Sequence, residues 1–359
     1  MFKKYIPYVI SIIFFLSLYY PVLITYFTQD DFFHFKIAST DNSLKGLFYL
    51  IGFHPFNERG IAFYRPIFRD LLYHFSYNFF GLNQIPLRVL SFIIHFINIY
   101  LIYIFSYSIF KNKAVSYFSP FFYAIATNNV ATFYYLAGGI QTLGVLMFIL
   151  ISSILFIKYL DKNTIKYLIF SFIAFLLALA SHEQSVIIPF VFLGLMLIKK
   201  GFRVSITKGG IKYLVPFFVT LAAYLYLNII VIGYSSNEVY YQPVFSPKII
   251  LNSLIWYSGW ALGLPEMLID FAPRIFKLDP RLMRYWGEYF RIILPAFFVS
   301  LFLLFYSFIY LLIRFKKTLI NKSLILFIVW FLIGISPVIL FPFHKSGQKP
   351  YQEEDLPFQ

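Results

Sequence analysis

Long runs of apolar residues recur along this chain and constrain its fold more than any other feature. A helix needs roughly 20 apolar residues to cross a hydrocarbon core of about 30 Å. Runs of this kind begin near Tyr5, Ile85, Leu136 and Tyr213, with shorter ones between them. The chain is 60% hydrophobic and only 13% charged, a composition unlike that of soluble domains. We therefore predict an all-α fold, a polytopic transmembrane helical bundle of about 9–10 spans.

The charged residues indicate topology. The formal net charge is +15, but the Lys and Arg residues lie in short clusters between apolar runs. Such clusters orient spans and contact anionic lipid or a phosphorylated lipid substrate, so no nucleic-acid partner is predicted. The chain has no cysteine, which excludes disulfides and thiolate metal sites.

The first run predicts an uncleaved span with a cytoplasmic N-terminus. Met1-Phe2-Lys3-Lys4 precedes apolar residues from Tyr5 to Phe27, a run too long for a signal peptide. Asp30 and Asp31 then lie on the external side. The Lys199–Arg203 cluster is the strongest cytoplasmic signal, and counting spans back from it puts residues 182–183 on that same external side. We predict a multi-pass protein of the plasma (inner) membrane with an external active site.

Residues 1–342 are predicted to form the transmembrane domain, with a long first external loop at about 28–84. Asp41-Asn42-Ser43 is a helix N-cap signal before Leu44–Ile51. Residues 64–80 form an amphipathic pattern that favours a position in the membrane interface. Residues 249–268 either span or re-enter the membrane, and the loop charges favour the second. Residues 343–359 are a polar segment, either a terminal tail or the point where a longer protein was cut.

Two pairs of polar residues stand out. Asp30 and Asp31 are adjacent carboxylates directly after a span, so they are either a solvated helix cap or part of a functional site. His95 and Asn98 lie three residues apart and share a helix face. For that pair we favour a hydrogen bond between helices.

Three motifs resemble those of the GT-C superfamily of membrane glycosyltransferases, nearest its protein O-mannosyltransferase-like and related bacterial branches. The Asp30-Asp31 pair resembles the acidic pair of the first external loop. Tyr64-Arg65-Pro66, followed by a span with polar residues, resembles the second block of the family. Ser181-His182-Glu183 resembles its Ser-Lys-Glu segment, with His182 where Lys is common.

The resemblance implies an inverting transfer of a sugar from a polyprenyl phosphate to a hydroxyl of a glycan, lipid or protein. Such a reaction needs a carboxylate that accepts a proton and positive charge near the leaving phosphate. We expect Asp30 or Asp31 to be the general base, and Glu183 to orient a neighbour or the acceptor. The basic candidates for the phosphate are Arg65, Arg69, His182, His344 and Lys345.

Alternatives to this interpretation remain. Asp30, Asp31 and His34 could hold a divalent cation, but three ligands within five residues of a loop are a weak signal. A transporter or a lipid-linked-sugar flippase would also have many spans, although charges near the middle of its spans would be expected. A non-catalytic GT-C-like protein is a third alternative.

Overall fold

The computed structural model describes residues 6–126, 129–201, 212–233 and 245–261, together with positions 302, 306 and 309. Throughout these residues the chain forms helices joined by turns and contains no strand. The predicted all-α class is therefore confirmed.

The described residues fall into two compact units. The first contains those up to 233 together with 309, and the second contains residues 245–261 with 302 and 306. The second unit has one described helix, α15 (Pro247–Ala261). The remainder of the predicted 249–268 segment, most of the C-terminal part of the predicted 1–342 transmembrane domain and the 343–359 segment lie outside the described residues.

Three helical segments in the described part of the first unit are long and apolar enough to cross a bilayer. They are α6 (Ile85–Phe110), α9 (Leu136–Lys162) and α14 (Val215–Tyr226) continued by η5 (Leu227–Ile232). α6 begins at Ile85, where the sequence predicts a long apolar run to begin.

A fourth span results if a bent pair at the N-terminus is counted as one. The first arm is formed by residues Tyr8–Ile24, within α1 (Ile6–Tyr19) and η2 (Tyr20–Ile24). The second arm is α2 (Gln29–Ile37), and the chain bends by 70° between the two arms. The acidic pair therefore lies at a sharp corner of the chain.

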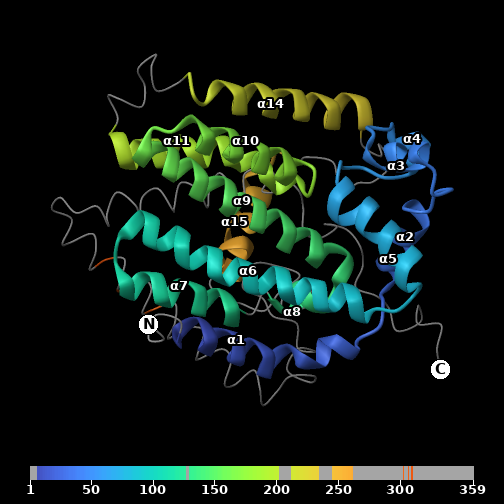
Figure 1. The fold of residues 1–359 in the computed structure, drawn as a ribbon, viewed down its shortest axis with the longest axis horizontal. Coiled ribbons are helices and arrows are strands. Elements are labelled where there is room, and N and C mark those ends of the chain that lie inside the picture. Colours follow the sequence, from blue (N-terminus) through green and yellow to red (C-terminus); the bar gives the residue numbers. More distant parts are fainter. Residues whose placement is uncertain are drawn as a thin grey trace. The chain divides into compact units, whose positions relative to one another are not determined.

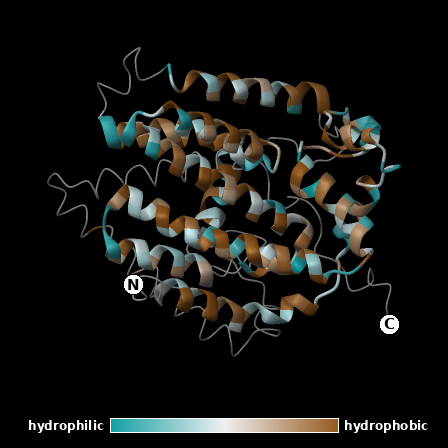
Figure 2. Ribbon diagram, viewed as in Figure 1, coloured by the Kyte–Doolittle hydropathy of each residue, from teal (hydrophilic) through white to brown (hydrophobic). Residues whose placement is uncertain are grey.

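Shorter helices lie between these candidate spans along the chain. They are α7 (Lys113–Ile125), α10 (Ile165–Leu179) and α11 (Ile188–Lys200). Contacts run from α1 to α7, from α7 to α6, from α6 to α9, and from α9 to α10 and α11, with α14 beyond them (Figure 1). Hydrophobic residues follow the length of these helices, and hydrophilic ones gather at their ends (Figure 2).

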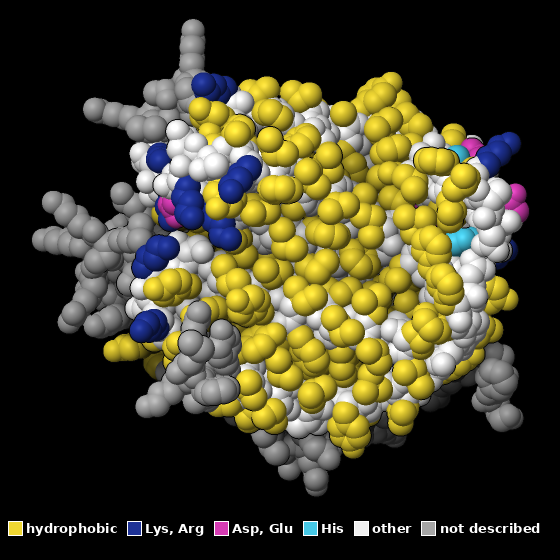
Figure 3. Space-filling view, viewed as in Figure 1, with side chains coloured by type: hydrophobic (Ala, Val, Ile, Leu, Met, Phe, Trp, Pro, Cys, Tyr) yellow, Lys and Arg dark blue, Asp and Glu magenta, His cyan; other side chains and the backbone are white. Residues whose placement is uncertain are grey.

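We call these adjacent helices of the first unit the helix row. The two ends of its helices differ in charge. Lys and Arg side chains cluster at the end where α6, α9 and α11 finish (Figure 3). There Lys199 pairs with Asp161, with Nζ 3.0 Å from Oδ1. The short helices of the first loop lie at the opposite end (Figure 1).

The first loop is mostly helical. It contains α2, α3 (Leu44–Ile51), α4 (Phe56–Arg59), η3 (Pro66–Leu71, a π-helical turn) and α5 (Leu72–Phe80). The predicted N-cap is confirmed, because the Ser43 hydroxyl accepts a 3.0 Å hydrogen bond from the backbone N–H of Gly46. α3 has the predicted bounds.

Two glycines allow close packing around α9. A Cβ on Gly144 would lie 2.1 Å from the Phe68 ring, so its absence lets η3 rest against α9. A Cβ on Gly139 would lie 1.6 Å from the carbonyl oxygen of Thr132. Gly139 therefore lets α8 (Asn129–Tyr134) fold tightly onto the start of α9.

Candidate functional site

A cluster of ionisable side chains lies at the end of the first unit where the first loop packs; we call it the polar centre. Its members come from the start of α2, from η3, from the start of α9 and from η4 (Glu183–Ile187). Electrostatic interactions connect His34 to Asp30, Arg65 and Arg69, and connect His182 to Arg65, Arg69 and Glu183. The structure thus brings together six candidates: Asp30, Asp31, Arg65, Arg69, His182 and Glu183.

Asp31 is buried, with 0% of its surface exposed, and its carboxylate is fully engaged. Oδ2 accepts hydrogen bonds from the backbone N–H of Thr28 at 2.8 Å and from its hydroxyl at 2.9 Å. Oδ1 accepts from the Tyr73 hydroxyl at 2.6 Å. Burial, together with the nearby Asp31 carboxylate, raises the pKa of Tyr73, so this hydroxyl remains a donor. Asp31 closes a capping box that starts α2.

Asp30 is exposed and has a different partner. Its Oδ2 accepts a 2.5 Å hydrogen bond from the hydroxyl of Tyr135, which precedes α9. Burial raises the pKa of Tyr135, and the hydrogen bond to Asp30 raises it further, so Tyr135 is a neutral donor. Asp30 also lies in the first turn of α2, where the helix dipole favours a negative charge.

Arg65 and Glu183 form a bidentate pair that joins the first loop to the turn between α10 and α11. The Arg65 Nε and Nη2 atoms donate to the two carboxylate oxygens of Glu183 at 2.8 and 2.5 Å. Nη1 donates to Oε1 of the buried Gln141 at 2.9 Å. Burial is the largest single influence and acts to raise the pKa of Glu183, but the Arg65 charge, the interaction with His182 and the hydrogen bonds together outweigh it, so the net pKa is lowered. Glu183 is therefore held as a carboxylate.

His182 is neutral at pH 7. Burial lowers its pKa to about 4, and the charge of Arg65 lowers it in the same direction. Its Nδ1 accepts from the backbone N–H of Gln184 at 3.3 Å and lies 3.5 Å from Oε2 of Glu183. The structure therefore places His182 in the centre without a positive charge for a phosphate.

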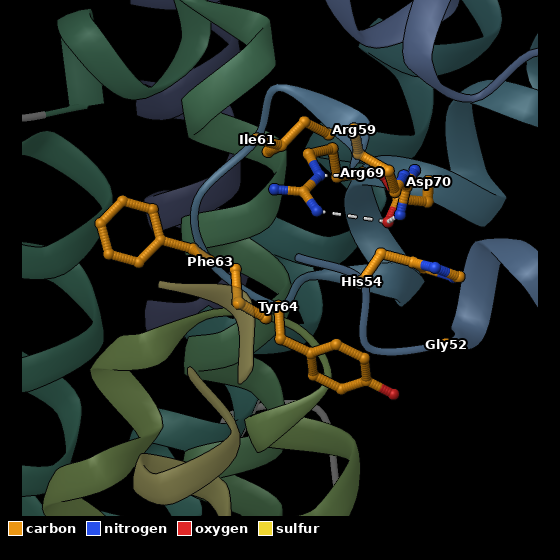
Figure 4. Close-up of a pocket in the computed structure, with 9 residues that line it drawn as sticks. Gly52, His54, Arg59, Ile61, Phe63, Tyr64, Arg69 and Asp70 are labelled. Carbon is orange, nitrogen blue, oxygen red and sulfur yellow. Dashed lines mark hydrogen bonds and ion pairs between the residues drawn. The ribbon is translucent and has the colours of Figure 1, made fainter. Parts of the chain in front are cut away.

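Arg69 is buried and paired, which differs from the water-facing role expected of an amphipathic segment. Its Nε donates to Oδ1 of the adjacent Asp70 at 2.9 Å, and Arg59 donates to Oδ2 of that carboxylate at 3.2 Å. All three side chains line a small open hollow, with both arginines turned toward Asp70 (Figure 4). No pattern in the sequence groups Arg59 with the site.

His34 carries an unsatisfied atom. Its Nδ1 is buried without a hydrogen-bond partner, and its ring lies edge-on to Tyr73 with centroids 5.0 Å apart. Burial lowers its pKa to about 4, and Arg69 and Arg65 add to this effect. Within the described ranges, no three His, Asp or Glu side chains gather in a way that could hold a metal ion. The oxygens of Asp31 are turned to Thr28 and Tyr73 instead.

Two members of the centre were missed by the sequence analysis, and two candidates cannot be placed. Tyr135 and Tyr73 contact the acidic pair, yet the chain has 30 tyrosines and nothing in the sequence singles these out. His344 and Lys345 lie outside the described residues.

A comparison with protein families finds one match. Residues 64–229 match the family described as dolichyl-phosphate-mannose-protein mannosyltransferase. This region is similar to that mannosyltransferase family. The match spans Arg65, Arg69, His182 and Glu183, and begins after Asp30 and Asp31. A search of curated proteins found no match, and neither did a search of solved structures.

Family membership and the apolar helices together define the class of protein. The mannosyltransferase family is part of the GT-C superfamily, which confirms the resemblance drawn from the sequence. The chain is a membrane glycosyltransferase of the GT-C type.

Proposed function

We propose that this glycosyltransferase moves a sugar from a polyprenyl-phosphate donor to a hydroxyl acceptor with inversion, and that Asp30 is the general base. The observation that carries the proposal is the contrast within the acidic pair. Asp30 is exposed and has one neutral partner among the described residues, whereas Asp31 is buried with both oxygens engaged.

The chemistry requires a carboxylate oxygen that can face the acceptor. With the Tyr135 hydroxyl on Oδ2, Oδ1 of Asp30 is left to accept the proton of the acceptor hydroxyl. As that proton leaves, the acceptor oxygen bonds to the anomeric carbon and the carbon–oxygen bond to the phosphate breaks. The phosphate departs with the bonding electrons. A base of this kind contributes typically 10²–10⁴-fold to a rate.

Arg65 supports recognition of the donor phosphate. An arginine has five N–H donors, and three of those on Arg65 bond to Glu183 and Gln141 among the described residues. Two donors then remain for phosphate oxygens, which guanidinium groups bind well. Glu183 and Gln141 would orient the guanidinium, and His182 would contribute a neutral polar group. His344 and Lys345 stay candidates for the same phosphate.

The distribution of charge favours an enzyme acting at one membrane face over a transporter. The ionisable groups of the centre lie at one end of the helix row, and α14 with η5 carries no charged residue. The Lys-rich turns at the other end fit a cytoplasmic face by the positive-inside rule. The polar centre would then face the exterior of the plasma membrane, with the N-terminus in the cytoplasm.

The test offers purified protein in nanodiscs a panel of polyprenyl-phosphate sugars and measures sugar release and transfer. We expect turnover of one donor by the wild type and its loss in Asp30→Asn. Asp161→Asn is the matched control, because it removes an exposed carboxylate at the opposite end of the helix row and should leave turnover unchanged. Wild-type turnover in Asp30→Asn, or no donor turned over by folded protein, would overturn the proposal.

A further inference from the structure

A buried arginine links the two segments that carry Asp30 and Tyr135. Arg88, in the first turn of α6, has 0% of its surface exposed. Its Nη2 donates to the carbonyl oxygen of Tyr26 at 3.1 Å, and its Nη1 donates to the carbonyl oxygens of Phe133 and, at 3.4 Å, Tyr134. A buried guanidinium needs such partners, and here they are main-chain groups of two different segments.

Each of these segments leads directly into the Asp30–Tyr135 contact. Tyr26 lies just before α2, which begins with Gln29 and Asp30. Tyr134 is the residue before Tyr135, whose backbone N–H and C=O bond to Ala131 and Gly139 at 3.0 and 2.9 Å. The Tyr135 backbone is thus fixed from both sides. Its hydroxyl reaches Asp30 across the two segments that Arg88 joins.

We propose that Tyr135 is a positioning residue that holds the Asp30 carboxylate toward the acceptor, and that Arg88 sets the distance between the two. This inference rests on the proposed role of Asp30 as the base. Tyr135 fixes one oxygen of Asp30 and so orients the other, and it keeps its own proton throughout the reaction. Arg88 acts through the main chain and touches neither substrate nor Asp30.

A tyrosine suits this task because it is neutral. An arginine in the same place would hold the carboxylate ionised, as Arg65 does for Glu183. One hydroxyl donor restricts rotation of the Asp30 carboxylate and leaves its second oxygen open. The hydroxyl is not needed for core packing, since Tyr135 is an exposed residue outside both buried apolar clusters.

The decisive variant is Tyr135→Phe, which removes one hydroxyl. We expect kcat to fall about 10-fold, the cost of one hydrogen bond to a charged group, with KM nearly unchanged. A fall in kcat at an unchanged KM separates lost positioning of Asp30 from weakened binding of the donor.

The matched control is Tyr77→Phe, an exposed tyrosine of α5 in the first loop, which should change neither kcat nor KM. In an Asp30→Asn background, Tyr135→Phe should not lower the residual turnover further. If Asp30→Asn lowers turnover as proposed while Tyr135→Phe keeps wild-type kcat, this inference is wrong and the proposed base stands. If Asp30→Asn keeps wild-type turnover, the proposed base itself is wrong.

Arg88→Lys tests whether Arg88 holds the two segments at a fixed distance. A lysine ammonium cannot span the carbonyls of both segments as a guanidinium fork does. We expect the same fall in kcat at nearly unchanged KM as in Tyr135→Phe, and no additional fall when the two changes are combined. Additive losses of kcat, or wild-type kcat in folded Arg88→Lys, would contradict the role of Arg88. Should Arg88→Lys fail to fold, Tyr135→Phe alone decides whether the pair is positioned as proposed.

Discussion

Asp30 and Glu183 are carboxylates of one polar centre in two different surroundings. Glu183 binds a guanidinium through both oxygens, and its pKa is lowered. Asp30 is more exposed and has one neutral hydroxyl donor. The difference separates two tasks that residue type alone cannot separate. A carboxylate paired with arginine fixes the geometry of the centre, whereas one held by a single hydroxyl can accept a proton.

The largest effect should separate the two carboxylates by turnover. Asp30→Asn is expected to lower kcat by about 10³-fold, since it removes the proposed base. Glu183→Gln is expected to lower it by about 10-fold and to raise KM, because it frees Arg65 from its orientation without removing the base. Steady-state kinetics of both variants with one donor checks this. An equal loss of kcat in the two variants would mean that Asp30 and Glu183 do not have the different roles assigned to them.

Stability should show the opposite order. Glu183→Gln leaves the Arg65 charge without its partner, and at 17% and 32% side-chain exposure of the two groups we expect a cost of about 2 kcal/mol. Asp30→Asn should change the free energy of unfolding by less than about 0.5 kcal/mol.

Thermal unfolding in detergent measures these differences. The double variant Arg65→Gln with Glu183→Gln should lose less than the sum of the two single changes, because the pair is then removed together. A fully additive result would mean that Arg65 and Glu183 contribute independently.

Each of the two regions also carries a histidine, His34 near Asp30 and His182 beside Glu183. Both have a pKa lowered to about 4, against about 6.5 in an unfolded chain. Between these values the unfolded state binds more protons, so stability is fully present above pH 6.5 and is lost as the pH falls toward 4. The lowered pKa of Glu183 acts in the same direction.

We therefore expect the melting temperature to fall on acidification, by an amount equivalent to at most about 3 kcal/mol per histidine. His34→Asn and His182→Asn should each flatten the dependence. A melting temperature that stays constant or rises from pH 6.5 to 4 would show that neither histidine is buried in its neutral form.

The smallest effect serves as a control for the whole comparison. Ser43→Ala removes the N-cap of α3 in the same loop and should cost about 1 kcal/mol. Turnover should be unchanged, because α3 contributes no residue to the polar centre. Loss of activity in this variant would mean that any destabilisation of the first loop, rather than the identity of the carboxylate, controls turnover.

Local chemistry made part of this structure predictable. Ser43 could be assigned as a cap because a hydroxyl before an apolar run meets the unpaired N–H groups of a helix start. The bounds of α6 follow from one uninterrupted apolar run between two polar turns. The placement of His95 and Asn98 on a buried face of α6 also follows from helical spacing. Their predicted hydrogen bond between helices holds for Asn98, which donates to the carbonyl oxygen of Leu143 at 2.9 Å, but not for His95, whose ring nitrogens have no partner.

Contacts between distant segments could not be predicted in this way. Arg69 was a candidate for the donor phosphate in an amphipathic segment, but in the structure it is buried in the π-helical turn at Pro66–Leu71 and paired with Asp70, which also binds Arg59. The sequence pattern of one segment does not predict which carboxylate or carbonyl group of a distant segment will lie against it. Tyr135 and Arg88 were missed for this reason, since each acquires its role from a partner more than 40 residues away.

The 70° bend between the N-terminal helices and α2 bears on where a lipid-linked donor and a water-borne acceptor can meet. A polyprenyl chain cannot leave the hydrocarbon layer, and a water-borne acceptor cannot enter it. On the proposed function, a base at this bend would stand at the boundary that both reactants can reach. Diffusion of the lipid within the plane would then bring donors to a fixed carboxylate, and the protein would need to carry neither reactant through the other's solvent.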